Sequence, residues 1–175
     1  MTRMLMVAAG LAVLIAALLV PAAVAGHGKT IKVRGECCAG GSDTISGDLQ
    51  GTLKWTDDGF GIFLSTLTYD QERGILKFEF TQVFDGTIGG RKVKFYTRDK
   101  STQRVKPGTP LYDFSTFPSD QPGTTGDPAR WLGGSGTSEI TPGEDGLIGI
   151  SGKLRWRSIE FLGRSSYKGK VKLPS

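Results

Sequence analysis

The chain has 175 residues, of which 38 % are hydrophobic, 22 % are charged and 26 are glycine. That length fits one domain with a core of its own and argues against a second domain. The formal net charge of +5 favours contact with anionic surfaces, but it is too small to indicate a nucleic-acid-binding protein.

The first 25 residues have the pattern of a secretory signal peptide. Arg3 supplies one positive charge, Met4–Val20 is apolar, and Ala23-Val24-Ala25 has the small-x-small spacing of a cleavage site. An uncleaved anchor is the alternative, because about 20 apolar residues span a bilayer. We expect cleavage after Ala25, which leaves a secreted or periplasmic protein of residues 26–175 that does not span the membrane and carries a net charge of +4.

Apolar and charged residues alternate along much of the mature chain, which predicts half-buried antiparallel strands. For example, Val93 and Phe95 alternate with Lys92 and Lys94. Turns rich in Gly and Asp separate such runs, and no amphipathic helix is evident. The predicted strands cover residues 29–36, 45–56, 61–69, 74–84, 91–99, 135–141, 147–158 and 166–173.

A meander of about eight strands must hide its edges, and closing into a barrel does so most economically. We therefore predict one all-β domain over residues 26–175, built as an antiparallel barrel. A two-sheet β-sandwich is the alternative architecture.

A Pro- and Gly-rich segment at 107–128 interrupts the meander. Its prolines exclude a central strand, because proline lacks the backbone N–H that a sheet needs. The segment nevertheless carries Tyr112, Phe114 and Phe117, which a merely solvated loop does not need. We expect it to pack onto the barrel, either covering a mouth or capping one end of the core.

Two similar pentapeptides place a Trp near a strand end. They are Gly51–Trp55 (GTLKW) and Gly152–Trp156 (GKLRW), each with Leu and Trp on one face. These aromatic residues either fill the core or line a ligand cavity. The residues that we select as candidates for ligand binding are Trp55, Phe78, Phe80, Tyr112, Phe114, Phe117 and Trp156.

The two cysteines, Cys37 and Cys38, are adjacent. Disulfide-linked residues usually have Cα atoms about 4.4 to 6.8 Å apart, whereas neighbours across a trans peptide are about 3.8 Å apart. Three states remain open: a strained ring between the two, two thiols without a shared role, and pairing between molecules. Export makes oxidation available.

No catalytic residue can be assigned from the sequence. His27 is the only histidine and lies next to the predicted cleavage site, so a Ser-His-Asp or Cys-His arrangement is not expected. A zinc site of Cys37, Cys38, His27 and Glu36 lacks the usual ligand spacing, and we expect no metal or cofactor. Lys168, Lys170 and Lys172 alternate along the last strand, either as protection against edge pairing or as a surface for an anionic envelope polymer.

Glycine-rich stretches resemble the bacterial allene oxide cyclase and dirigent-like barrel group. Residues 84–95 (FDGTIGGRKVKF) look like its glycine-rich turn between strands, and 133–140 (GGSGTSEI) with 146–152 (GLIGISG) is similar to its late hairpin. The resemblance covers less than a quarter of the chain. It implies an antiparallel barrel whose cavity accepts apolar or phenolic molecules, which some members isomerise or couple. It assigns no catalytic residue here.

The sequence thus leaves three functions open for an exported β-barrel. The first is binding of a small apolar or aromatic ligand, without catalysis. The second is a cyclase-like or dirigent-like isomerase in the same cavity. The third is an envelope interaction protein that uses its lysine-rich face.

Overall fold

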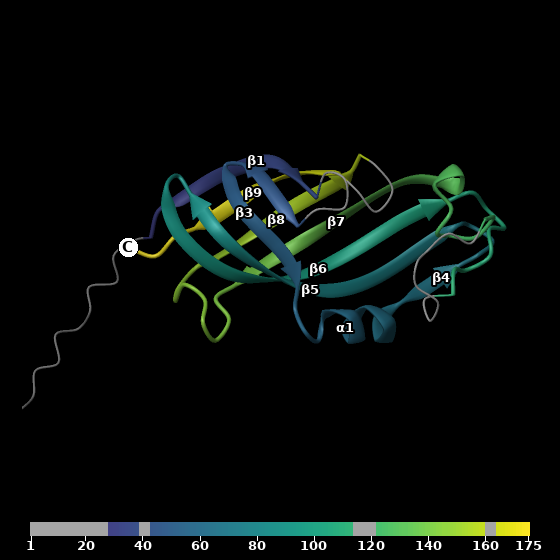
Figure 1. Cartoon of the computed structure of the whole chain (residues 1–175), viewed down its shortest axis with the longest axis horizontal. Helices are drawn as coiled ribbons and strands as arrows, with labels where there is room; N and C mark the ends of the chain where they lie inside the picture. Colours follow the sequence, from purple (N-terminus) through teal and green to yellow (C-terminus); the bar gives the residue numbers. More distant parts are fainter. Residues whose placement is uncertain (1–27, 39–42, 114–121, 160–163) are drawn as a thin grey trace, which may run out of the picture.

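The computed structural model describes residues 28–38, 43–113, 122–159 and 164–175, and these are nearly all β (Figure 1). The elements in chain order are β1 (Thr30–Cys37), β2 (Thr44–Gly47), β3 (Leu49–Trp55), α1 (Gly59–Thr66), β4 (Thr68–Asp70), β5 (Ile75–Ile88), β6 (Arg91–Val105), the 3-10 turn η2 (Pro128–Arg130), β7 (Trp131–Thr141), β8 (Ser151–Ser158) and β9 (Ser165–Lys172). In these ranges there is no helix with the length and apolar character needed to cross a membrane.

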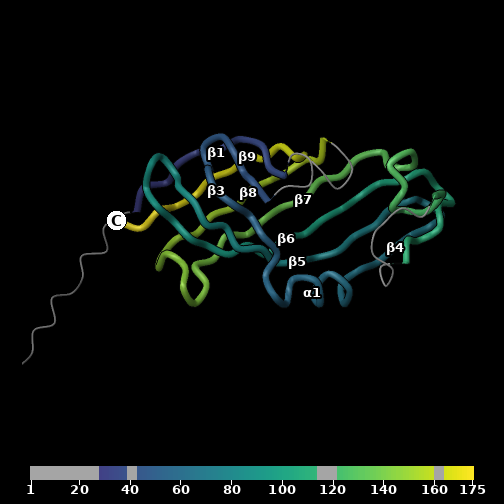
Figure 2. The backbone as a smooth tube through the Cα atoms, in the orientation of Figure 1, coloured from purple at the N-terminus to yellow at the C-terminus, as the bar shows by residue number. Residues whose placement is uncertain are grey.

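Eight strands close into an antiparallel barrel. Neighbouring strands pair in the order β3-β2-β1-β9-β8-β7-β6-β5, and pairing of β3 with β5 completes the ring. Strand β4 joins only β5, beyond the part of β5 that pairs with β3. The tube in Figure 2 shows β5, β6 and β7 extending past the closed ring toward β4. The predicted barrel is confirmed, and the sandwich is not the architecture of this chain.

The barrel is packed with apolar side chains toward the β5–β6 hairpin. Phe84 and Phe95 lie opposite each other on β5 and β6, with ring centroids 4.6 Å apart. Gly89 and Gly90 form the turn between these strands with φ of +57° and +81°, which suits the two-residue hairpin turns that need positive φ. The buried core around this end includes Val33, Leu49, Phe84, Ile88, Val93, Phe95, Ile140, Ile150 and Val171.

The strand predicted at 61–69 is wrong, because most of this segment is helix α1, followed by the short β4. In a helix, residues three apart share a face, so Phe60 and Phe63 stack side by side with ring centroids 5.8 Å apart. Phe63 is buried against Phe78 of β5, whose ring centroid is 4.8 Å away. Burial of Phe63 against β5 therefore favours a helix over the weak alternation of the segment.

Other predicted boundaries shift without changing the fold. The single strand predicted at 45–56 is a hairpin of β2 and β3, in which Thr44 lies opposite Thr52. Strand β5 continues to Ile88, through residues predicted as a turn. Strand β8 begins at Ser151 rather than at residue 147.

The described parts of the 107–128 segment pack at the far end of the long strands. Thr109, Tyr112 and Thr125 are buried there. The Tyr112 backbone N–H donates to Thr125 Oγ1 at 2.9 Å, and the Tyr69 hydroxyl of β4 donates to the Thr109 carbonyl. The described residues of this segment thus cap the β4 end of the structure.

Candidate functional site

Away from the packed end, the inward side chains leave a cavity of about 280 Å3 inside the barrel. Across β5, β6 and β7, Phe80, Asp99 and Ser138 lie opposite one another in one row. Most of the β6 and β7 residues that face this space are small or polar, unlike the Phe and Ile residues of the packed end. Their side chains cannot fill the barrel, so space remains.

One wall of the cavity is aromatic. Trp55 stacks on Phe80 with ring centroids 5.0 Å apart and planes 14° apart. Phe63 of helix α1 does not line the cavity but packs against Trp55 edge-on, with ring centroids 5.9 Å apart. Trp55 is 45 % exposed, so this wall extends from the interior to the surface of the protein.

Trp156 lines a different side of the cavity, on β8. It lies opposite Gly136 of β7 and Tyr167 of β9. A Cβ atom at position 136 would overlap the Trp156 ring, so glycine is required for the indole to lie across β7. Leu53 and Leu154 of the two similar pentapeptides also line the cavity.

Asp99 is the buried carboxylate of the cavity wall and is only 1 % exposed. Its Oδ2 accepts a hydrogen bond from the Thr97 hydroxyl at 2.5 Å, and its Oδ1 accepts one from the Ser138 hydroxyl. Burial raises the pKa of Asp99 from its ordinary value of 3.8 to about 6, although the two hydroxyl donors act in the opposite direction. Neither donor is charged, so no positive charge offsets the effect of burial, and the pKa of Asp99 stays close to neutral pH.

Two polar side chains continue the Asp99 side of the wall along β6. Gln103 Nε2 donates to Ser101 Oγ at 3.2 Å, and Gln103 Oε1 accepts from Trp131 Nε1 at 3.0 Å. Asp99, Ser101 and Gln103 are spaced by two residues, so they share the inward face of the strand. They form a polar strip that faces the same cavity as Phe78 and Phe80.

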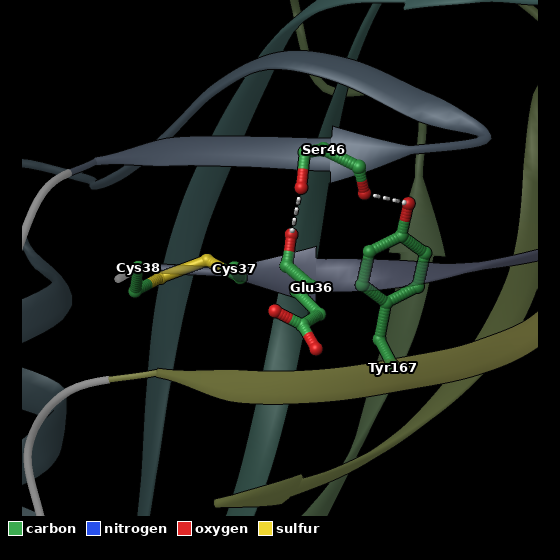
Figure 3. Close-up of a disulfide and its surroundings, with 5 residues drawn as sticks. All are labelled: Glu36, Cys37, Cys38, Ser46 and Tyr167. Atoms are coloured by element: carbon green, nitrogen blue, oxygen red, sulfur yellow. Dashed lines mark hydrogen bonds between the residues drawn. A yellow bond between two sulfur atoms is a disulfide. The ribbon is translucent and has the colours of Figure 1, made fainter. Parts of the chain in front are cut away.

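Tyr167 also lines the cavity, but its hydroxyl is used by the fold (Figure 3). The hydroxyl donates to the Ser46 carbonyl at 2.9 Å and accepts from the Leu49 backbone N–H at 2.9 Å. Burial raises the pKa of Tyr167 to about 12. The hydroxyl therefore stays protonated and holds the β2–β3 hairpin in place, and it is not available as an acid or base.

Cys37 and Cys38 form a disulfide with each other, and their Cα atoms are 3.7 Å apart. Of the three states left open by the sequence, the ring between neighbours is the one observed. Cys37 is the last residue of β1, and Cys38 has a φ of +67°. Figure 3 shows the disulfide at the end of β1. Both cysteines line the cavity, so the disulfide is part of its wall.

The structure brings together four of the seven candidate ligand-binding residues. Trp55, Phe78, Phe80 and Trp156 all line the cavity. Tyr112 is buried but does not line this cavity. Phe114 and Phe117 lie outside the described residues.

Sequence reasoning did not single out Asp99 as a candidate site residue. The signal was present, because extending the alternation of Val93 and Phe95 by two steps places Thr97 and then Asp99 on the inward face. It also missed Phe60 and Phe63, because their segment was predicted as a strand.

Comparison with protein-family models, curated proteins and solved structures gave no match to this chain. Within the ranges that the structure describes, no group of three or more His, Cys, Asp or Glu residues could hold a metal ion.

Proposed function

We propose that this protein binds a small aromatic molecule carrying a hydroxyl group, with the ring in the barrel cavity and the hydroxyl on Asp99. One observation carries the proposal: the cavity has an aromatic wall and, beside Phe80 on the neighbouring strand, a buried carboxylate without a charged partner among the described residues. Sites that combine apolar walls with a few fixed polar groups are typical of small-molecule binding.

The size of the cavity restricts the ligand. A cavity of about 150 Å3 is known to hold benzene, and this one measures about 280 Å3. A molecule of one or two rings therefore fits, whereas a larger ligand must extend past Trp55 into solvent.

The carboxylate restricts the chemistry. Each Asp99 oxygen accepts one hydroxyl donor from the protein and keeps a lone pair for another. An ionised carboxylate accepts strongly from a phenol, so affinity is expected to rise as pH increases through about 6.

Binding can be tested with monocyclic phenols and their methyl ethers, followed by tryptophan fluorescence in a Trp131→Phe background that leaves Trp55 and Trp156 as reporters. We expect phenols to quench the emission and to bind about tenfold more tightly than the ethers, since a hydrogen bond to a charged group contributes about 1.5 to 3 kcal/mol. Asp99→Asn should remove that preference.

Asp57→Asn is the matched control, because it makes the same change at an exposed position. It should leave both quenching and preference unchanged. Absence of quenching by every compound, or an equal preference for phenols in the Asp99→Asn protein, would contradict the proposal.

A second candidate function is isomerisation in the same cavity, supported by the pKa of Asp99 of about 6 and by the resemblance to the cyclase and dirigent-like group. A carboxylate with this pKa can take a proton from carbon at neutral pH and return it at another position. We expect deuterium from D2O to enter a small aryl ketone beside its carbonyl, as measured by NMR, faster above pH 6 than below. Exchange no faster than in buffer, or unchanged by Asp99→Asn, would exclude this activity.

We also propose that the protein is exported. This part of the proposal rests on the sequence alone, because residues 1–25 lie outside the described residues. N-terminal sequencing of the protein from its medium or periplasm should begin at Gly26. An N-terminus at Met1 would favour the uncleaved anchor instead.

A further inference from the structure

Six cations lie in two rows on the outer face of three adjacent strands, β1, β9 and β8. In one row Lys170 lies opposite both Lys32 and Lys153, and in the other Lys168 lies opposite both Arg34 and Arg155. We call these six residues the cation grid. All six side chains are exposed, and they surround an open depression of about 680 Å3.

The fold removes the simplest explanation of the cation grid. Lysines often protect a free strand edge against pairing with another chain. Strand β9 pairs with β1 and β8, and β8 pairs with β9 and β7, at every cation that they carry. Strand β1 pairs with β9 along its whole length but with β2 only at Gly35–Cys37. Figure 1 shows β1, β9 and β8 within the continuous barrel wall. The four cations of β8 and β9 therefore protect no edge, and the Arg34 backbone is already hydrogen-bonded to Asp48.

Without a bound anion, repulsion within the cation grid is expected to lower the stability of the fold. Side chains directly opposite on neighbouring strands have Cβ atoms about 4.5 to 5.5 Å apart, and like charges at that separation destabilise the sheet. Among the residues that the structure describes, none of the six forms a salt bridge. Two carboxylates lie near the cation grid without pairing closely: Glu139 of β7 is opposite Lys153, and Asp48 lines the same depression. The six cations also exceed the net charge of +5 of the whole chain, so the remaining charges nearly balance.

We propose that the cation grid is a binding surface for a flexible linear phosphate polymer. Cations spaced by about 6.7 Å along a strand and about 4.8 Å between strands can each meet a different phosphate of one extended chain. Arg34 and Arg155 add forked donors that suit phosphate oxygens. A polymer can follow the convex wall of a barrel.

The surroundings of the cation grid favour a polymer over two other polyanions. The outward positions next to it on the same strands are Thr30, Glu36, Ser151, Arg157, Ser166 and Lys172, so no aromatic side chain is present for stacking single-stranded bases. The same positions lack the apolar anchors that surfaces bound to lipid interfaces combine with their cations.

The test uses the purified protein with long-chain inorganic polyphosphate, measured by calorimetry at several salt concentrations. If about four cations are neutralised, affinity should fall about fifty-fold between about 50 and 200 mM salt. Lys168→Gln with Lys170→Gln should weaken binding about tenfold or more. Arg34→Gln with Arg155→Gln is a second, independent pair and should do the same.

Lys54→Gln with Lys77→Gln is the matched control, because it removes the same charge from exposed positions on β3 and β5. It should leave binding within about twofold of the unchanged protein, and circular dichroism checks that every variant is folded. Equal loss in the control and the cation grid variants would overturn the proposal.

Two further probes distinguish the alternatives. Vesicles of equal parts phosphatidylglycerol and phosphatidylcholine test a membrane surface, and a single-stranded oligonucleotide of matched charge tests nucleic acid. Binding of polyphosphate that is tighter than both, and lost in the cation grid variants, supports the proposal. Tighter binding of vesicles or oligonucleotide, or no binding of polyphosphate, overturns it.

Discussion

At the scale of single residues, Asp99 and Tyr167 show how one cavity holds two titratable groups with different uses. Tyr167 donates to and accepts from the backbone of the β2–β3 hairpin, so its hydroxyl is fully occupied. Asp99 accepts only from neutral hydroxyls and stays buried beside empty space. The tyrosine hydroxyl supports the wall, whereas the Asp99 carboxylate keeps capacity to accept further hydrogen bonds, as the proposed ligand would require.

Asp99 should make the protein less stable as pH rises. Its pKa is 3.8 ordinarily and about 6 in the folded state, so between these values the folded protein keeps a proton that the unfolded chain has released. The stabilisation is complete below pH 3.8 and is lost as pH passes about 6, an effect of about 3 kcal/mol in unfolding free energy. Urea unfolding at several pH values should show this loss, and Asp99→Asn should remove it.

Comparison of the unchanged protein with the Asp99→Asn protein separates the effect of Asp99 on stability from the effects of the other carboxyl groups. Hydrogen bonds and ion pairs lower the pKa of Asp58, Glu79, Asp127 and Asp145, so these groups contribute stability that is lost as pH falls. The same four groups titrate in the unchanged protein and in the Asp99→Asn protein, so their contributions cancel in the difference in unfolding free energy between the two. A difference that does not change between pH 4 and 7 would show that Asp99 titrates normally.

Tyr167→Phe should lower the free energy of unfolding by about 1 to 3 kcal/mol. The change leaves the buried Leu49 N–H and the Ser46 carbonyl without the hydroxyl that now serves both. Tyr96→Phe is the control, because its hydroxyl meets Asp145 at an exposed site where water can replace it. Equal destabilisation by the two changes would argue against the role of Tyr167.

At the scale of elements, β1, β9 and β8 place like charges opposite one another on the outer wall of the barrel. The repulsion is a cost to the sheet that binding of an anion would offset. Strand β9 is central to it, since each of its two cations faces a cation on both sides.

Lys168→Gln should therefore stabilise the protein in the absence of any polyanion. Removing this charge relieves repulsion from Arg34 and Arg155, with an expected gain of about 0.2 to 1 kcal/mol in unfolding free energy at low salt. The gain should nearly vanish at about 1 M salt, where the screening length is about 3 Å. Lys54→Gln, which lies opposite the uncharged Val83, should show no such gain. A loss of stability at low salt would indicate that Lys168 has a structural role.

At the scale of the whole molecule, the barrel is filled at one end and hollow at the other. The filled end carries Leu49, Phe84 and Val171, each 0 % exposed. The hollow end is bordered by helix α1 and the long β5–β6–β7 extension, which lie beyond the closed ring (Figure 1). The packed core and the cavity thus lie at different places along one barrel.

Hydrogen exchange should reveal this division. Amides in β4, which pairs only with β5, and in the short α1 are expected to exchange more than tenfold faster than those of β6 around Phe95, because local opening there does not break the ring. A bound phenol should slow exchange at α1 and leave the filled end unchanged. Uniform protection along the chain would contradict the division.

The sequence by itself determined the all-β class, the barrel and the inward position of Trp55, Phe78, Phe80 and Trp156. Alternation with a period of two indicates which face of a strand each residue occupies. It failed at α1, where burial of Phe63 against β5 outweighs local pattern. The tertiary structure alone decided which inward positions leave space and which outward cations meet. Both depend on register: Asp99 faces Phe80 and Ser138, and Lys168 faces Arg34 and Arg155, only because of how strands distant in sequence pair.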